Sequence, residues 1–170
     1  LQDGTLKCWG QDSNGQVGDG GTNSDQSSPV TINLGSSRTA ASVSAGIYHT
    51  CAVLDDGSIK CWGLNNEGQL GDGSTTTRTT PVSVNLDAGK IAFAVAAGMN
   101  HTCAIVDNHV ECWGIDDQNQ LKLASGYSLS SSSQSQSTPV TSLGDTYYGG
   151  DFSKLRAISA GYNHTCVVSD

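Results

Sequence analysis

The sequence predicts an all-β repeat protein, and three observations support that prediction. A phrase that contains His-Thr-Cys and ends in Cys-Trp-Gly occurs twice inside the chain, and its two halves occur once more at opposite ends. Short apolar runs alternate with clusters of Gly, Asn, Asp and Pro, without helical periodicity. About four short strands in a unit of roughly fifty residues match one β-propeller blade. We therefore expect three blades' worth of chain, with one blade split between the termini.

The cysteines set the register of the repeat. Cys8 and Cys61 are 53 residues apart, Cys61 and Cys112 are 51 apart, and joining the chain ends would make the last interval 66. Each unit should contain a strand that starts at a Pro-Val pair, an apolar run that ends in Ala-Gly, the His-Thr-Cys strand and the Cys-Trp-Gly strand. The expected parts are residues 1–45 (back half of a blade plus linker), 46–97 (blade), 98–160 (blade with a Ser-rich insertion at 125–138) and 161–170 (front half of the split blade).

Two internal hairpins should place cysteines opposite each other. A three-residue turn at 55–57 supplies Gly where a left-handed residue is needed, and a two-residue turn at 107–108 keeps the same cysteine geometry in a hairpin one residue shorter. Opposed residues of an antiparallel pair lie within the Cα separation that a disulfide tolerates. The expected disulfides are Cys51–Cys61, Cys103–Cys112 and, across the chain ends or between subunits, Cys8–Cys166.

These thiols could instead be reduced, buried, small hydrophobes, but three register-matched pairs favour disulfides. No Cys-x-x-Cys spacing suggests a zinc site. Disulfides indicate an oxidising compartment, so we expect an extracellular or cell-surface location. Each bond closes a short loop and should add about 3 kcal/mol at most.

Charge and hydropathy limit the classes of partner that the protein can have. Eight basic residues against sixteen acidic ones give a pI near 4.6, which argues against nucleic-acid binding and against an anionic membrane surface. The sequence has no run of eighteen apolar residues and no basic-then-apolar leader, so we expect no membrane insertion. An exported protein without a leader would be a mature product or a segment of a longer chain.

Residues 61–73 (CWGLNNEGQLGDG) and 8–20 (CWGQDSNGQVGDG), each following a Gly-x-x-His-Thr phrase in the repeat, resemble repeats of the regulator of chromosome condensation family, in its secreted, disulfide-containing form. The resemblance covers nearly the whole chain. It implies a β-propeller, usually of seven blades, that closes its ring by completing one blade from both termini. The third unit departs from the pattern, because residues 116–124 have lost the loop glycines.

Three blades cannot close into an ordinary ring, and an open set would expose strand edges and apolar faces. Further blades of a longer chain could complete it. Alternatively, copies could join end to end, the segment 161–170 receiving the segment 1–10 of a neighbour; two copies would then give six blades. The candidate interaction residues are Leu1, Asp3, Gly4, Gly161, His164 and Asp170.

Candidate chemistry is sparse, and we expect no catalytic residue, cofactor or metal. His49, His101 and His164 occupy equivalent positions and could form a metal site or proton relay, but structural histidines that bond backbone within their own blade are favoured. Asp19 and Asp72 lie in Gly-Asp-Gly loops and could bind calcium, but a turn role is favoured.

Trp9, Trp62 and Trp113 each follow a cysteine and should form core between blades, with the indole N–H bonded locally. Asn100 and Asn163 satisfy the glycosylation sequon, although both belong to the repeat phrase at the start of a strand expected to be buried. No Ser, Cys or Thr nucleophile is placed with a base, so we do not expect an enzyme.

We expect a structural or adhesive extracellular repeat protein that presents loops, and that either belongs to a longer chain or polymerises through its half-blades. Its partners would be copies of itself or the rest of a longer chain. The loops at 20–28, 73–80 and 123–138 vary while the strands repeat, and they form the expected recognition surface. An alternative is a secreted propeller that binds or inhibits a partner through its loop face. A third, nucleotide exchange on a small GTPase, is disfavoured by the acidic balance and the disulfides.

Overall fold

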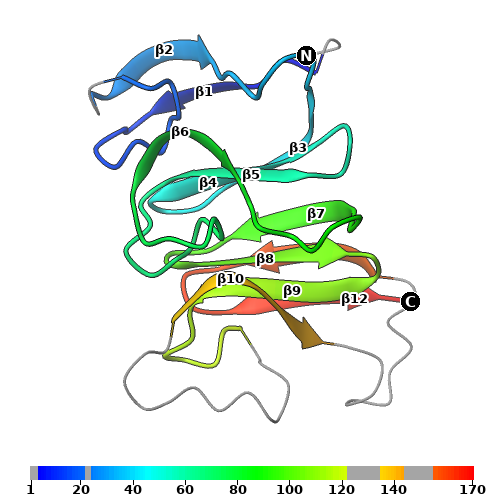
Figure 1. The fold of residues 1–170 in the computed structure, drawn as a ribbon. Helices are drawn as coiled ribbons and strands as arrows, with labels where there is room; N and C mark the ends of the chain where they lie inside the picture. Colours follow the sequence, from blue (N-terminus) through cyan, green and yellow to red (C-terminus); the bar gives the residue numbers. More distant parts are fainter. Residues whose placement is uncertain (1–3, 22–23, 122–134, 144–154) are drawn as a thin grey trace.

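The computed structural model describes residues 4–21, 24–121, 135–143 and 155–170. Within these residues the chain is all-β, with twelve strands in four separate antiparallel sheets and no helix. The sheets follow one another in chain order, from the N-terminal pair to the C-terminal pair (Figure 1). In the described residues there is accordingly no helix long and apolar enough to cross a membrane.

Two sheets are complete four-stranded blades and two are half-blades. The first blade contains β3 (Ala40–Ala45), β4 (His49–Leu54), β5 (Ile59–Gly63) and β6 (Arg78–Ser83). The second contains β7 (Ala92–Ala97), β8 (His101–Val106), β9 (His109–Ile115) and β10 (Ser135–Leu143). The N-terminal half-blade is β1 (Lys7–Gly10) with β2 (Gln26–Thr31), and the C-terminal half-blade is β11 (Leu155–Ala160) with β12 (Thr165–Ser169). The chain therefore holds three blades' worth of strands, one of them split between its ends.

Both internal hairpins have the predicted register. Cys51 lies opposite Cys61 across β4 and β5, and Cys103 lies opposite Cys112 across β8 and β9. Gly57 closes the first turn with φ +78°, a left-handed conformation that costs glycine little. In the second hairpin the whole two-residue turn is left-handed, with φ +46° at Asp107 and +64° at Asn108, as a type I′ turn requires. Local turn chemistry thus fixes which residues face each other.

The sheets begin earlier than the expected boundaries at residues 46 and 98. β3 pairs with β4, placing Ala45 opposite Thr50, so the first complete blade starts at Ala40. β7 pairs with β8 in the same way, and the second blade starts at Ala92. The apolar run before each Ala-Gly is therefore the first strand of its own blade, because its backbone groups bond to the His-Thr-Cys strand that follows.

The Pro-Val pairs do not start strands. Pro29 and Pro81 are each the fourth of six residues in β2 and β6, the outermost strands of their sheets. Each lies where the ladder is irregular, and such places tolerate a residue without an N–H. Of the Ser-rich insertion at 125–138, residues 125–134 lie outside the described residues, and 135–138 begin β10.

The core lies between the sheets. Every residue of β4 and of β8 is buried, because each of these strands is covered on both faces by neighbouring blades. Three apolar clusters fill the successive interfaces, and the largest contains Cys51, Val53, Ile59, Leu70 and Trp113. A blade is therefore stabilised mainly by its neighbours, as in other repeat proteins.

Candidate protein-interaction site

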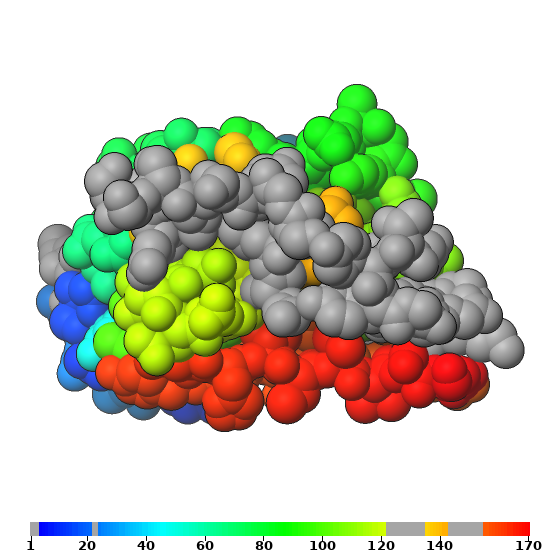
Figure 2. All heavy atoms as spheres, turned by 90° about the horizontal axis from the view of Figure 1, so that it is seen from below, coloured from blue at the N-terminus to red at the C-terminus, as the bar shows by residue number. Residues whose placement is uncertain are grey.

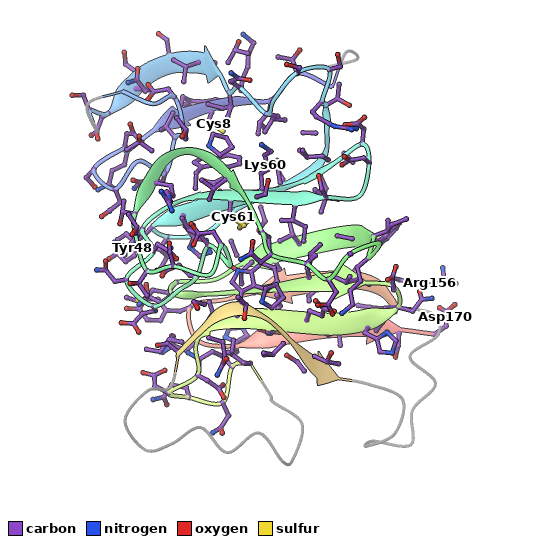
Figure 3. The ribbon with its side chains drawn as sticks, viewed as in Figure 1. Cys8, Tyr48, Lys60, Cys61, Arg156 and Asp170 are labelled. Atoms are coloured by element: carbon purple, nitrogen blue, oxygen red, sulfur yellow. A yellow bond between two sulfur atoms is a disulfide. The ribbon has the colours of Figure 1, made fainter. Side chains whose placement is uncertain are left out.

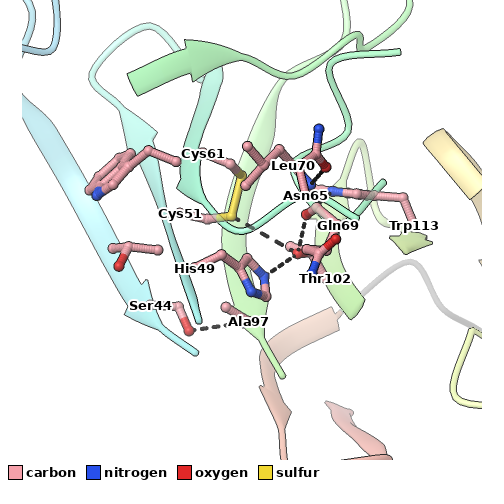
Figure 4. Close-up of a disulfide and its surroundings, with 12 residues drawn as sticks. Ser44, His49, Cys51, Cys61, Asn65, Gln69, Leu70, Ala97, Thr102 and Trp113 are labelled. Atoms are coloured by element: carbon pink, nitrogen blue, oxygen red, sulfur yellow. Dashed lines mark hydrogen bonds between the residues drawn. A yellow bond between two sulfur atoms is a disulfide. The ribbon is translucent and has the colours of Figure 1, made fainter. Parts of the chain in front are cut away.

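A backbone carbonyl, an indole, a hydroxyl and an imidazole join the first blade to the second (Figure 4). The Gln69 carbonyl, in the loop after β5, accepts from Trp113 Nε1 at 2.9 Å and from Thr102 Oγ1 at 2.8 Å. His49 Nε2 lies 2.8 Å from the same Thr102 hydroxyl. Because that hydroxyl proton goes to Gln69, the hydroxyl accepts from His49, which therefore carries its proton on Nε2. All of these side chains are buried, so the contacts are shielded from water.

The same contacts recur at the other interfaces with members missing at the ends. The Gln16 carbonyl accepts from Trp62 Nε1 at 3.0 Å and from Thr50 Oγ1 at 2.8 Å. His101 Nε2 lies 3.0 Å from Thr165 Oγ1, and that hydroxyl donates to the Gln120 carbonyl at 3.3 Å. In the described residues no indole reaches Gln120 and no imidazole reaches Thr50.

His49 and His101 are structural, but their side-chain partners lie across the blade interface. The prediction that each would bond to the backbone of its own blade is therefore wrong for these two residues. Burial, and to a lesser extent the neighbouring His101, lowers the pKa of His49 to about 3. Burial, and then the neighbouring His164, lowers the pKa of His101 to about 4. Both imidazoles are therefore neutral at physiological pH, and neither is poised as a proton relay.

Two of the three expected disulfides are present. Cys51–Cys61 and Cys103–Cys112 each join strands whose Cα atoms are 4.1 Å apart. Cys8 and Cys166 are free. Cys8 lies on β1 at the N-terminal end of the array, whereas β12 lies at the other end (Figures 1 and 3), so these two thiols cannot meet within one open chain. Burial raises the pKa of the Cys8 thiol to about 11.

The N-terminal half-blade leaves an open cleft of about 370 Å³ beside β3. Its lining includes Cys8, Trp9, Val43, Ile47 and Thr50. The Trp9 side chain is 63% exposed, whereas Trp62 and Trp113 are fully buried. The structure therefore does not show the expected core role for Trp9, because none of the described residues covers its side chain.

A second cleft, of about 270 Å³, opens at the C-terminal half-blade. Gln120 and Leu121 line one side, and His164, Thr165 and Val167 of the last hairpin line the other. Figure 2 shows this end of the molecule, where the loop up to residue 121 (yellow-green) adjoins the C-terminal strands (red). Each of the two clefts thus lies beside one of the half-blades.

The other candidate interaction residues are placed differently. Gly4 precedes β1, has φ +69°, and its carbonyl accepts from Ala40 N, so it lies against the start of the first complete blade. Gly161 begins the last hairpin loop, where its N–H donates to the His164 carbonyl. Asp170 is already paired with Arg156 (Figure 3). Leu1 and Asp3 lie outside the described residues.

The Gly-Asp-Gly loops have turn functions. Asp72 accepts from Ser74 and pairs with Arg78 at 3.0 Å, and Asp19 accepts from Gly21 N. No group of three or more His, Cys, Asp or Glu side chains within the described ranges is arranged to hold a metal ion.

The glutamine carbonyls and the threonines that join the blades were not predicted from the sequence. Two repeated features of the sequence could have indicated them. A Gln-Leu or Gln-Val pair follows each Cys-Trp-Gly at the same spacing, and a Thr follows the His of each His-Thr-Cys phrase. Gly18 and Gly71 complete the pattern, because a Cβ there would lie 2.4 Å from Trp62 Nε1 and 2.7 Å from Trp113 Nε1. Only glycine lets the indole approach the loop.

These features define a β-propeller repeat protein in which neighbouring blades are joined through buried side chains. Comparison with known families identifies the repeat. The Regulator of chromosome condensation (RCC1) repeat matches residues 3–53 and 56–105, and a second model of the same repeat matches 40–69. The chain belongs to this family.

Known relatives agree with that assignment. The chain is 36% identical over 103 residues to the ultraviolet-B receptor UVR8 of Arabidopsis thaliana, covering 61% of this chain and 23% of the receptor. It is 33% identical over 103 residues to the human probable E3 ubiquitin-protein ligase HERC3, covering 61% of this chain and 10% of the ligase. The chain therefore spans less than a quarter of the length of either relative.

Solved structures show the same fold. Prp20p from Saccharomyces cerevisiae has a TM-score of 0.78 with 18% identity, covering 96% of this chain and 39% of Prp20p. Human WBSCR16 has a TM-score of 0.73 with 22% identity, covering 93% of this chain and 38% of that structure.

Proposed function

We propose that this chain is a non-enzymatic extracellular repeat protein with a structural or adhesive role, which assembles through its half-blades. The observation that supports this most directly is the pair of open half-blades. Among the described residues each has a strand edge without a partner strand, and exposed apolar side chains such as Trp9, Val43 and Val168 lie at these ends. Unpaired edges and exposed apolar surface favour β-strand addition by another polypeptide.

Protein binding is also what the structural relatives suggest. The structure of Prp20p is described together with binding to Gsp1p and histones, and yeast RCC1 (Prp20) has been seen bound to Kap60. At the identity found here these likenesses concern the fold alone, so no particular partner is carried over. The disulfides support an oxidising, extracellular setting.

Sedimentation of the whole chain, under non-reducing conditions and over a range of concentrations, tests the proposal. We expect the native mass to rise well above the 17.5 kDa of one chain, while denatured, reduced protein stays at that mass. Quenching by acrylamide should fall in parallel as Trp9 becomes covered. A monomer at every concentration, with Trp9 still accessible, would contradict assembly.

One observation favours a second function, in which the face made by the loops binds or inhibits a partner protein. The loops after β1, β5 and β9 follow equivalent strands of successive sheets, where Gly10 pairs with Gln26, Gly63 with Arg78 and Gly114 with Gln136, so they lie on one face of the array. Among the described residues this face has seven carboxylates and one guanidinium: Asp12, Asp19, Asp25, Glu67, Asp72, Asp116 and Asp117, with Arg78. Such a face fits a basic partner. A chain that stays monomeric but binds polylysine, with loss of binding in Asp19→Asn/Glu67→Gln, would favour this function over assembly.

A further inference from the structure

A bulge that contains proline recurs in the last strand of three sheets, β2, β6 and β10. In the first complete blade Cys61 pairs with Val82 and Gly63 with Arg78, so the single residue Trp62 lies opposite three residues of β6. The N-terminal half-blade and the second blade have the same irregularity at the same place. The bulged triplets are Ser27-Ser28-Pro29, Thr79-Thr80-Pro81 and Ser137-Thr138-Pro139. Each triplet therefore holds two hydroxyl side chains followed by a proline.

The bulges lie on the outer rim of the array of blades. β7 lies beside β3 and β11, so the first strand of each complete blade is its innermost strand and the last is its outermost. Proline has no N–H to donate, and the residue before a proline prefers an extended backbone. The residue before each proline is therefore presented on an extended, irregular segment at the rim and not in a regular ladder.

The first residue of a triplet is held by the loop of the preceding unit. The Thr79 carbonyl accepts from Gly20 N at 2.9 Å, and a Cβ on Gly15 would lie 2.9 Å from the Thr79 Cα. The Ser137 carbonyl accepts from Gly73 N at the same distance. Thr79 and Ser137 are half-buried as a result.

The second residue of each triplet is open to solvent. Ser28, Thr80 and Thr138 are exposed, and among the described residues none of their hydroxyls has a hydrogen-bond partner. Thr80 is exposed even though it lies against the preceding loop. Its methyl group faces that loop, since a Cβ on Gly20 would lie 3.0 Å from Thr80 Cγ2. Three free hydroxyls therefore stand at equivalent places on the rim.

We infer that Ser28, Thr80 and Thr138 are sites of O-glycosylation, each taking a sugar on its hydroxyl. The inference rests on the extracellular setting of the proposed function, because proteins receive such sugars on the secretory route. Serine and threonine close to proline are typical of O-glycosylated segments. A sugar at the rim also has a physical role, since its bulk shields the outer edge of a sheet from pairing with another chain.

A neutral sugar suits these positions better than a phosphate group. Thr80 lies against Gly20, which follows Asp19 in the sequence. A phosphate adds about two negative charges, which neighbouring carboxylates repel unless a basic side chain pairs with it. Arg78, two residues before Thr80, is already paired with Asp72 at 3.0 Å. Phosphorylation would therefore meet repulsion at this place, whereas a sugar brings no charge.

The transfer needs a nucleoside-diphosphate sugar as the second substrate of a glycosyltransferase. The Thr80 oxygen attacks the anomeric carbon of that sugar, and a C–O bond forms between them. The bond from the same carbon to the phosphate oxygen breaks, and the nucleoside diphosphate leaves with the proton of the hydroxyl. No oxidation or reduction takes place.

Peptide mapping of the whole, oxidised chain tests the inference. The chain is incubated with a polypeptide N-acetylgalactosaminyltransferase and UDP-N-acetylgalactosamine, and then digested with trypsin. Cleavage after Arg78 and Lys90 gives the peptide 79–90, whose hydroxyl residues are Thr79, Thr80 and Ser83. Electron-transfer fragmentation should place the sugar of this peptide on Thr80, and the same mapping should place sugar on Ser28 and Thr138.

Two matched variants show whether the bulge selects the site. Thr80→Ala should lower the sugar on peptide 79–90 about tenfold. Ser83→Ala should leave it unchanged, although Ser83 is also exposed and lies on the same strand. Ser83 differs because it follows the proline and pairs with Lys60 in the regular ladder. A synthetic peptide of residues 79–90, added to a parallel reaction, confirms that the transferase is active on this sequence.

The outcomes separate the inference from half-blade assembly. Sugar on Thr79 or Ser83 in place of Thr80 overturns the inference, as does an unmodified chain when the synthetic peptide is modified. Phosphate in place of sugar on Thr80, in chain secreted by animal cells, overturns it as well. Sedimentation of the unmodified chain tests assembly without any sugar, so a chain that carries sugar on Thr80 but stays monomeric supports this inference while assembly fails.

Discussion

Trp113 and Trp9 occupy the same position in two units of the chain, but the first side chain is buried and the second is exposed to solvent. Trp113 is fully buried and donates to the Gln69 carbonyl, whereas Trp9 is 63% exposed and lies beside an open cleft. The local phrase is the same, Cys-Trp-Gly, so the difference comes from the neighbour and not from the unit. Each blade supplies half of a contact set whose other half belongs to the next blade.

The comparison teaches that stability in this chain is located at the interfaces between blades. β4 and β8 are wholly buried because each lies between two other blades, whereas β12 is largely exposed with the same His-Thr-Cys sequence at its start. Equivalent substitutions should therefore have large effects in the interior and small effects at the ends. Four pairs of variants test this, and they are best measured on dilute, non-associated protein.

The largest contrast is expected between Trp113→Ala and Trp9→Ala. The Trp113→Ala change leaves a cavity in the largest core cluster and removes one of the two donors to the buried Gln69 carbonyl. We therefore expect a loss of about 3 to 5 kcal/mol in the free energy of unfolding. Trp9→Ala should cost less than about 0.5 kcal/mol, because its side chain is already in water. Urea denaturation measures both. Equal costs would mean that Trp9 is covered within a single chain.

Sequence could predict the hairpins because their determinants are local. Gly57 and the Asp107-Asn108 pair fix the two turns, and the turns fix which cysteines are opposed. The first strands of the two blades, which begin at Ala40 and Ala92 and not at the expected residues 46 and 98, could not be predicted in this way, since hydrogen bonding between whole strands decides to which sheet β3 and β7 belong.

The contacts between blades were beyond prediction for a different reason. His49 and Thr102 are 53 residues apart in sequence, and Trp113 and Gln69 are 44 apart. The acceptor of the indole is moreover a backbone carbonyl, whose chemistry does not depend on residue type. The repeated phrase indicated that these residues matter, but only the relative placement of the blades shows what they bind.

The second contrast concerns pH, and compares His101→Gln with His164→Gln. Burial lowers the pKa of His101 to about 4 in the folded chain, below its ordinary value near 6.5. The neutral ring is thus favoured by folding, so its contribution is complete above pH 6.5 and is lost as the pH falls toward 4. We expect the wild-type chain to lose about 1 to 3 kcal/mol at this site over that range.

Gln at position 101 could still donate to Thr165 and does not titrate, so the thermal stability of His101→Gln should depend less on pH between 6.5 and 4. His164→Gln should retain most of the wild-type profile, because it leaves the burial of His101, the larger cause of the lowered pKa, unchanged and removes only the smaller effect of the neighbouring ring. Scanning calorimetry at half-unit pH steps compares the three proteins. If the dependence of thermal stability on pH were flattened in His164→Gln and not in His101→Gln, the contrast between the interior site and the end of the chain would be contradicted.

The third contrast compares Gly46→Ala with Gly161→Ala, two equivalent positions after Ala. A Cβ on Gly46 would lie 2.4 Å from the Gly98 carbonyl oxygen of the next blade, and that backbone atom cannot move without displacing β7. We expect a loss of about 2 kcal/mol. A Cβ on Gly161 would meet only the ring of its own exposed His164, which can rotate away, so less than about 0.5 kcal/mol should be lost. Equal losses in urea denaturation would contradict the comparison.

The loops of the terminal and interior units differ in charge at matching positions. In the loop after β5, Asn65 Nδ2 donates to Asp72 and to two backbone carbonyls, and Arg78 pairs with Asp72. In the loop after β1 the places of Asn65 and Asp72 are taken by Asp12 and Asp19, and Gln26, which follows Asp25, takes the place of Arg78. The terminal loop therefore lacks the two donors that neutralise the interior one.

The smallest effect is therefore expected for Asp12→Asn, and it should be stabilising. Burial, and then the charges of Asp19 and Asp25, raises the pKa of Asp12 above 3.8 despite a bond from Val17 N. A raised folded pKa means that its stabilising contribution is present below pH 3.8 and is lost as the pH rises. Asp12→Asn should gain about 1 kcal/mol at pH 7, and the gain should vanish below about pH 4. The reverse variant Asn65→Asp should lose stability at pH 7. A destabilised Asp12→Asn would show that the terminal loop needs its charge.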